Sequence, residues 1–259
     1  MAEWVDVLAR YGALWTAMIV LVACAIGYGI GVWVRHPGQG LRPPTQLSGR
    51  ARMLLLAWAV VGLGVFAVIV HALREPGGAL DMLDTQLAQG LAATLPPGLL
   101  QGVAVFTQIG DRAFLMGVGA SVLAILLWYG RWSLAMVWVA AAAGGGTLNK
   151  VLKAMFERVR PEHAHGFLQA EGFSFPSGHA TGAVAVYGML AFVLARTVTA
   201  HRHPILFSAA CGLIAAVGLS RVLLHVHFMS DVLAGWAVTS AWIAACILIF
   251  DALTRGRKQ

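Results

Sequence analysis

Long runs without a single charged residue constrain the fold of this chain more than any other feature. Such runs cover residues 13–34, 53–70, 113–129, 132–148, 180–195, 204–220 and 232–250. About 20 apolar residues in a helix cross the hydrocarbon core of a bilayer, and a helix satisfies its own backbone polar groups there. We therefore expect an all-α protein, a polytopic membrane helix bundle with seven spans.

The composition agrees with a membrane protein. Of the 259 residues, 59% are hydrophobic and 11% are charged, whereas soluble domains average about 25% charged residues. The net charge of +7 comes from dispersed basic residues, which disfavours a nucleic-acid partner. Cys24, Cys211 and Cys246 lie inside apolar runs without a CxxC spacing, so we expect packing residues and no metal site. No cleavage pattern follows the first run, so we expect no cleavable signal peptide. No cofactor is expected either.

Basic residues gather in alternate loops. Arg35, Arg42, Arg50 and Arg52 lie in the loop 35–52, Arg131 lies in a short turn, further basic residues lie in 196–203, and Arg255, Arg257 and Lys258 lie in the tail. With seven spans these segments share one side, which the positive-inside rule places in the cytoplasm. The sequence thus predicts an N-terminal span and cytoplasmic loop (1–52), a membrane core (53–252) and a basic cytoplasmic tail (253–259) in the inner (plasma) membrane.

The segment 71–112 falls on the opposite, non-cytoplasmic side. Within it, Leu80, Leu83, Leu87 and Leu91 recur at helical spacing among acidic residues, and Pro96 and Pro97 follow. This pattern predicts an amphipathic helix at the membrane interface, ended by the prolines. A simple cover for the bundle and a gate for substrate both fit it.

Lys153 and Arg160 are the first candidate site residues. They are seven residues apart, or about two helical turns, so both cations can share one helix face before Pro161 ends the helix. Together they form a plausible phosphate clamp. Glu157, four residues after Lys153, offers an ordinary ion pair instead.

A second group opens the span 180–195. Ser177 and Gly178 sit where a helix begins, and helix N-termini favour bound anions. Gly178 permits close backbone approach, and His179 would project near the anion. We therefore expect a phosphate contact here rather than an ordinary interfacial histidine.

The third group combines Arg221 with His227 and Asp231. The last two are four residues apart, so on a helix they face the same way. A carboxylate that accepts a hydrogen bond from one imidazole nitrogen leaves the other as a nucleophile. Arg221 adds a third cation. Ionisable groups at membrane depth are costly and usually functional, which favours a site over a structural ion pair.

Read in order, the three groups resemble the signature of the type-2 phosphatidic acid phosphatase superfamily. The matching pattern is Lys153-x6-Arg160-Pro161, then Pro176-Ser177-Gly178-His179, then Ser220-Arg221-x5-His227-x3-Asp231. The resemblance implies a six-helix phosphatase core, to which the span 13–34 is an addition.

The same resemblance implies a role for each residue. His227 would be the nucleophile that forms a phosphohistidine, Asp231 would orient it, and His179 would protonate the leaving oxygen and later activate water. The phosphoryl oxygens would be bound by Lys153, Arg160, Arg221, Ser177 and Gly178. Three cations supply charge stabilisation without a metal.

The substrate and the fate of the phosphoryl group stay open. Undecaprenyl diphosphate, dephosphorylated at the periplasmic or outer face, is the leading expectation. Phosphatidylglycerol phosphate, phosphatidic acid and a lipid A phosphate are alternatives, as is a phosphotransferase that passes phosphate to a second lipid. Vanadium-dependent haloperoxidases share the signature but are soluble. A lipid transporter would need cations but not an oriented imidazole. The sequence does not indicate an oligomeric state.

Overall fold

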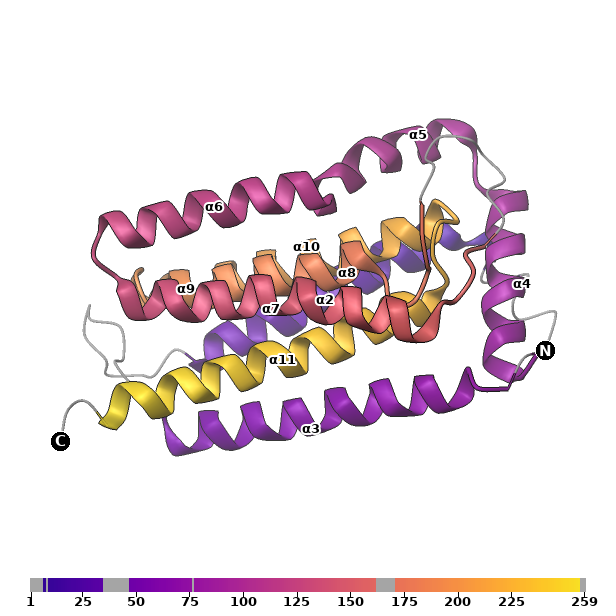
Figure 1. The fold of residues 1–259 in the computed structure, drawn as a ribbon. Helices are drawn as coiled ribbons and strands as arrows, with labels where there is room; N and C mark the ends of the chain where they lie inside the picture. Colours follow the sequence, from indigo (N-terminus) through magenta and orange to yellow (C-terminus); the bar gives the residue numbers. More distant parts are fainter. Residues whose placement is uncertain (1–6, 8, 35–46, 76, 162–170, 257–259) are drawn as a thin grey trace.

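The computed structural model describes residues 7, 9–34, 47–75, 77–161 and 171–256, and every regular element in these ranges is helical (Figure 1). The α-helices are α2 (Gly12–Val34), α3 (Gly49–Ala72), α4 (Ala79–Thr94), α5 (Pro97–Phe106), α6 (Arg112–Trp128), α7 (Trp132–Phe156), α8 (Gly178–Ala183), α9 (Met189–Ala195), α10 (His203–Leu223) and α11 (Met229–Gly256), with 3-10 turns η1 (Thr107–Gly110) and η3 (Ala200–Arg202) and a π-helical segment η2 (Val184–Gly188). The prediction of an all-α helix bundle is confirmed.

Six helical segments in the described ranges are long and apolar enough to cross a bilayer: Gly12–Val34, Gly49–Ala72, Pro97–Trp128, Gly178–Ala195, Ala200–Leu223 and Met229–Arg255. Helix α7, expected from the run 132–148, is 25 residues long and lies beside α6 (Figure 1). It extends past the run, carries Asn149, Lys150 and Lys153, and is not one of these six segments. Six of the seven expected spans are therefore apolar helices of spanning length.

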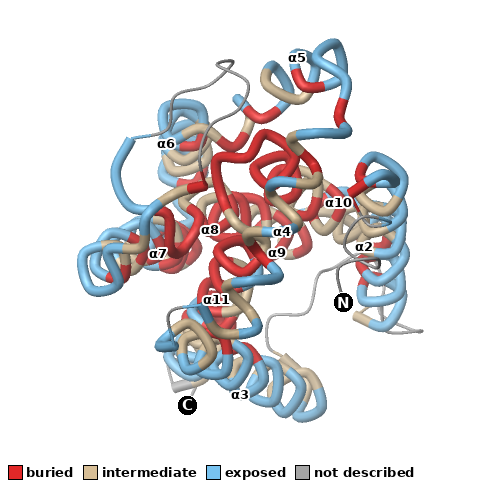
Figure 2. The backbone as a smooth tube through the Cα atoms, turned by 90° about the vertical axis from the view of Figure 1, so that its right-hand side faces the viewer, coloured by how far each residue is buried: buried red, intermediate tan, exposed pale blue. Residues whose placement is uncertain are grey.

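The core of the bundle surrounds the composite helix α8–η2–α9. Seen end on, buried residues concentrate at this helix and at the inward sides of α10 and α11, while the outer faces of α2, α3, α6 and α7 are exposed (Figure 2). Large apolar side chains such as Leu21 and Val68, both 69% exposed, cover these outer faces. Exposed apolar surface on this scale marks contact with lipid.

The additional N-terminal helix α2 packs along α10. Gly27 lies against the backbone of Phe207, and Gly31 lies against the backbone of Pro204, so a side chain at either position would collide with α10. Small residues that let helices approach closely are typical of membrane interfaces. The two glycines thus explain how the extra span joins the core.

Basic residues surround a buried carboxylate at one end of the bundle. Helix α2 begins at one end and α11 finishes at the other (Figure 1), as an odd number of crossings requires. Where α11 finishes, the buried Asp251 bonds Arg255 Nη2 at 2.7 Å, lies 3.9 Å from Arg52 Nε and accepts from Leu47 N–H at 2.7 Å. Of the other basic residues predicted on this side, Arg35, Arg42, Arg257 and Lys258 lie outside the described residues.

At the opposite end, α4 runs across the bundle at a steep angle to the long helices (Figure 1). It is the amphipathic helix expected in the segment 71–112, with Leu91 fully buried. Pro96 and Pro97 separate it from α5, where Pro97 takes the first position and needs no backbone N–H partner. This end of the bundle holds the predicted site.

Candidate active site

The three sequence motifs converge at the end of the bundle that α4 crosses. A cavity of about 880 Å³ opens there, and six of the eight predicted site residues line it: Lys153, Arg160, Gly178, His179, Arg221 and His227. The other two, Ser177 and Asp231, are fully buried behind its wall. Segments 78 residues apart in sequence, from Lys153 to Asp231, therefore form one site.

His227 and Asp231 form the expected pair, but not on one helix. His227 lies in the turn between α10 and α11, and Asp231 lies in the first turn of α11. The Asp231 carboxylate reaches back and accepts from Phe228 N–H at 2.9 Å and from His227 Nδ1 at 3.3 Å. The prediction of a shared helical face was wrong, because His227 lies before α11 begins. The Asp231 carboxylate caps the start of that helix and reaches the imidazole from there.

The environment of His227 favours a neutral, nucleophilic imidazole. Burial lowers the pKa of His227 to about 4, although the hydrogen bond and charge of Asp231 act in the opposite direction. At neutral pH the ring is therefore uncharged. With its proton on Nδ1 facing Asp231, Nε2 carries the lone pair, which accepts from Arg160 Nη1 at 3.1 Å.

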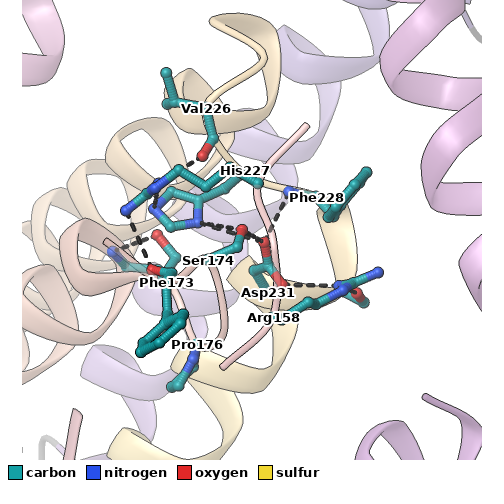
Figure 3. Close-up of polar contacts among 12 residues, drawn as sticks. Arg158, Phe173, Ser174, Pro176, Val226, His227, Phe228 and Asp231 are labelled. Atoms are coloured by element: carbon teal, nitrogen blue, oxygen red, sulfur yellow. Dashed lines mark hydrogen bonds and ion pairs between the residues drawn. The ribbon is translucent and has the colours of Figure 1, made fainter. Parts of the chain in front are cut away.

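Two further side chains hold Asp231 (Figure 3). Ser174 Oγ donates to its Oδ2, and Arg158 Nη1 donates to its Oδ1 at 2.8 Å. Ser174 Oγ also lies 3.3 Å from His227 Nδ1. The carboxylate is 0% exposed, so these donors fix its orientation.

Arg160 reaches His227 from an irregular segment. Helix α7 ends at Phe156, where Glu157 adopts a left-handed φ of 45°, so Pro161 does not end the helix as predicted. Arg160 Nη1 lies 3.1 Å from His227 Nε2 and donates to Val226 O at 2.7 Å, while Nε donates to Gly172 O at 2.9 Å. Its guanidinium binds loop carbonyls that a continuing helix would not reach.

Lys153 stays on the last turn of α7 and donates to the carbonyl of Phe173. Within the described part of the chain it makes no ion pair with Glu157, the alternative that the sequence left open. The ammonium and the Arg160 guanidinium share the carbonyl of Phe173, which brings both cations to one wall of the cavity.

The second motif positions His179 but uses Ser177 differently from the prediction. Ser177 caps α8 with its hydroxyl, and its backbone N–H donates to Asp231 O at 3.0 Å. That N–H is paired within the protein, so the prediction that it binds phosphate was wrong. Asn149 Nδ2 fixes the same turn by donating to Pro176 O at 3.1 Å. Gly178 and His179 face the cavity.

Arg221 completes the set of cations. It is only 5% exposed, and its Nη1 donates to Thr107 Oγ1 at 3.1 Å. Thr107, in η1, also bonds Ser220 Oγ at 2.8 Å. Arg221 Nε is buried and has no partner among the described residues, and the arginine lines the cavity.

Five residues that hold the predicted site, directly or through one intervening residue, were not assigned roles from the sequence: Asp84, Thr107, Asn149, Arg158 and Ser174. Asp84 carried a signal, since it lies four residues after Leu80 and seven before Leu91. That spacing places an acid on the apolar stripe of α4, where a buried partner is required. The others had no comparable signal, because their partners come from distant segments.

The cavity continues from the polar site into an apolar groove between α6 and α7. Leu115, Gly119 and Leu123 line it from α6, and Trp138, Val139 and Ala142 line it from α7. From Arg112 to Leu123 the groove follows α6 for about 16 Å at 1.5 Å per residue. A hydrocarbon chain fits this length of apolar wall.

Comparison with known proteins places the chain in a family. Residues 132–255 match the family model of the PAP2 superfamily. Phosphatidylglycerophosphatase B of Bacillus subtilis is 31% identical over 69% of this chain and 88% of its own length. Decaprenylphosphoryl-5-phosphoribose phosphatase of Mycobacterium tuberculosis is 28% identical over 72% and 96%, respectively.

A solved structure agrees. The crystal structure of a transmembrane PAP2 type phosphatidylglycerolphosphate phosphatase from Bacillus subtilis matches with a TM-score of 0.63 and 28% identity, covering 77% of this chain and 95% of that one. Helix bundle, motifs and relatives point the same way: the chain belongs to the PAP2 superfamily and is a multi-pass membrane phosphatase.

Proposed function

We propose that this protein removes phosphate from a membrane lipid through a covalent phosphohistidine at His227. One observation carries the proposal. A single cavity joins a ring of three cations and two histidines to an apolar groove between α6 and α7. The polar end suits a phosphate group and the groove suits the hydrocarbon part of a lipid.

In the first step, His227 Nε2 attacks phosphorus and the bond from phosphorus to the lipid oxygen breaks. His179 gives its proton to that oxygen, so the lipid leaves as an alcohol, or as a lipid monophosphate if the substrate is a diphosphate. Asp231 accepts the hydrogen bond from Nδ1–H and stabilises the positive charge that forms on the ring. Lys153, Arg160 and Arg221 compensate the charge on the phosphoryl oxygens.

In the second step, His179, now neutral, takes a proton from water. The resulting hydroxide attacks phosphorus and the phosphorus–nitrogen bond breaks. Inorganic phosphate leaves, His227 returns to its neutral form, and His179 is protonated again. The same histidine thus serves first as acid and then as base.

The cations lie beside the nitrogen that we propose attacks phosphorus. Arg160 Nη1 sits 3.1 Å from His227 Nε2, beside the atom that attacks. A phosphoryl group arriving there lies against the guanidinium of Arg160, and Arg221 lines the same cavity. We infer that these cations supply the charge role without a divalent metal.

The two relatives described above each favour one substrate class. The names of the Bacillus subtilis relative and of the solved Bacillus subtilis structure favour phosphatidylglycerol phosphate, whose phosphate is a monoester on a diacyl lipid. The mycobacterial relative acts, by its name, on a polyprenyl lipid, which favours the class of undecaprenyl diphosphate. We place phosphatidylglycerol phosphate first and keep the polyprenyl diphosphate as the second candidate.

The active site is proposed to face the periplasm or the outside. Arg52 and Arg255 cluster at the end of the bundle opposite the site, around Asp251, and basic loops favour the cytoplasm. The C-terminus would then be cytoplasmic and α4 would lie in the outer interface.

Phosphate release by the purified protein in detergent tests the proposal. The panel contains phosphatidylglycerol phosphate, undecaprenyl diphosphate, phosphatidic acid and a lipid A phosphate, each without a second lipid. Release from at least one of them, abolished in His227→Ala, supports the hydrolase. If label appears only in a second lipid after that lipid is added, the protein is a phosphotransferase. No release or transfer from any lipid would overturn the proposal.

A further inference from the structure

Arg158 occupies the centre of a charged cluster outside the cavity. It follows the end of α7 within the variable part of the first motif, and its side chain is 14% exposed. Nη1 donates to Asp231 Oδ1 at 2.8 Å and to Ser230 Oγ at 2.7 Å, and the guanidinium covers the ring of Phe228 at 4.2 Å. Asp231 lies between the imidazole of His227 and this guanidinium (Figure 3).

The other edge of the Arg158 guanidinium binds α4. Nη2 donates to Asp84 Oδ2 at 3.0 Å and to Asp81 Oδ1 at 3.2 Å. Asp84 is 4% exposed and also accepts from Ser230 N–H at 3.1 Å. Burial raises the pKa of Asp84, while Ser230 and Arg158 act against this. The arginine is therefore the cation that offsets two buried carboxylates.

Arg158 does not belong to the described residues that line the cavity, and both its terminal nitrogens are occupied by carboxylates. It is thus placed to act on Asp231 rather than on a substrate. The other charged groups near the His227–Asp231 pair lie on the cavity side: Lys153 of α7, Arg160 of the following segment, His179 of α8 and Arg221 of α10. On the side away from the cavity, Arg158 faces Asp81 and Asp84 of α4.

We propose that Arg158 is a positioning residue that links the interfacial helix α4 to the nucleophile. It holds the Asp231 carboxylate in the orientation that accepts a hydrogen bond from His227, and its charge offsets those of Asp231 and Asp84 together. The proposal rests on the proposed phosphohistidine chemistry. A planar fork suits this task because it can meet two carboxylates at fixed angles. Helix α4 then contributes Asp84 to the catalytic arrangement and is more than a cover for the bundle.

The charge arithmetic predicts opposite effects for two substitutions. Asp231, Asp84 and Arg158 together carry a charge of −1 when all are ionised. Arg158→Gln makes this −2, so the cluster and His227 bind a proton more readily. The acid limb of the kcat profile, which is the fall of kcat at low pH, therefore moves to higher pH. Asp84→Asn makes it 0, so the acid limb moves to lower pH.

The test compares four variants by kcat, KM and the pH profile of phosphate release. Arg158→Gln should lower kcat about 10- to 100-fold, the range typical of partners that orient a functional imidazole, with KM for the lipid changed less than about threefold. Arg158→Lys keeps the charge but loses the fork, so the acid limb should return toward the wild-type position while kcat stays low. Asp81→Asn is the matched control, since Asp81 is 39% exposed and contacts only Arg158 in this cluster; its profile should equal that of the wild type.

The outcomes separate this inference from the proposed function. If the wild type releases phosphate from no lipid, the proposed function fails. If the wild type is active and Arg158→Gln keeps the wild-type acid limb, the inference is overturned, whether kcat is unchanged or falls only through loss of folded protein. Vanadate inhibition, read on the same samples, should stay close to wild type in Asp84→Asn and Arg158→Lys, because neither residue lines the cavity.

Discussion

Replacing Thr107 by valine tests whether a hydroxyl outside the three motifs holds Arg221, a proposed phosphate-binding residue, in place. Thr107 is 0% exposed, accepts from Arg221 Nη1 at 3.1 Å and bonds Ser220 Oγ at 2.8 Å. Valine keeps the shape of threonine and removes only the hydroxyl. Arg221, 5% exposed, then loses a fixed partner in a site where water cannot readily replace it.

The expected loss follows from the strength of that contact. A hydrogen bond to a charged group contributes about 1.5–3 kcal/mol, and each 1.36 kcal/mol corresponds to about a tenfold change. If this energy holds Arg221 where it meets the transferring phosphoryl group, kcat/KM should fall about 10- to 150-fold. Thr107→Ser keeps the hydroxyl and should lose less than about fivefold on the same reasoning.

Phosphate release in detergent gives kcat/KM, and inhibition by vanadate reports oxyanion binding directly. Thr239→Val is the matched control, because Thr239 is also 0% exposed but its hydroxyl has no partner among the described residues. That control should retain wild-type activity. If Thr107→Val shows wild-type kcat/KM and wild-type vanadate inhibition, the hydroxyl does not position Arg221 and the reasoning is refuted.

Three further outcomes are expected. Activity should survive EDTA and be inhibited by vanadate, since Lys153, Arg160 and Arg221 take the charge role; loss in EDTA that magnesium restores would count against this. The free energy of unfolding should fall by about 3 kcal/mol as pH drops from 6.5 to about 4, because in that window the unfolded chain protonates His227 and the folded one does not; thermal unfolding of His227→Gln should lack this component. A reporter fused after Lys258 should read cytoplasmic, and a reading outside would invert the topology.

The apolar runs predicted the bundle well because membrane helices depend on length and composition more than on partners. The spans 13–34 and 53–70 became α2 and α3 within a few residues. The predicted helix boundaries were wrong where tertiary contacts determine the end of a helix. The local sequence does not indicate that α7 ends at Phe156, because the contacts of Arg160 with the carbonyls of Gly172 and Val226 shape the loop that follows.

The candidate site shows the same division. The motif residues could be named from spacing because each type has a distinct chemistry toward phosphate. The residues that hold them, such as Thr107 and Arg158, are set by contacts across 114 and 73 positions of sequence. The phosphate contact predicted for the backbone N–H of Ser177 was wrong for the same reason, since that N–H donates to the carbonyl of Asp231 in α11.

The most direct test of the central claim is to trap the phosphoenzyme. Wild-type protein is mixed with phosphate-labelled lipid and quenched under alkaline conditions, because phosphohistidine is labile in acid. His179→Ala is examined with an activated aryl phosphate, which needs no proton for its leaving group and should accumulate label because the base for water is missing. The account predicts label in the wild type, more label in His179→Ala, and none in His227→Ala with either substrate. Label retained in His227→Ala would remove that residue from the nucleophile role and contradict the account.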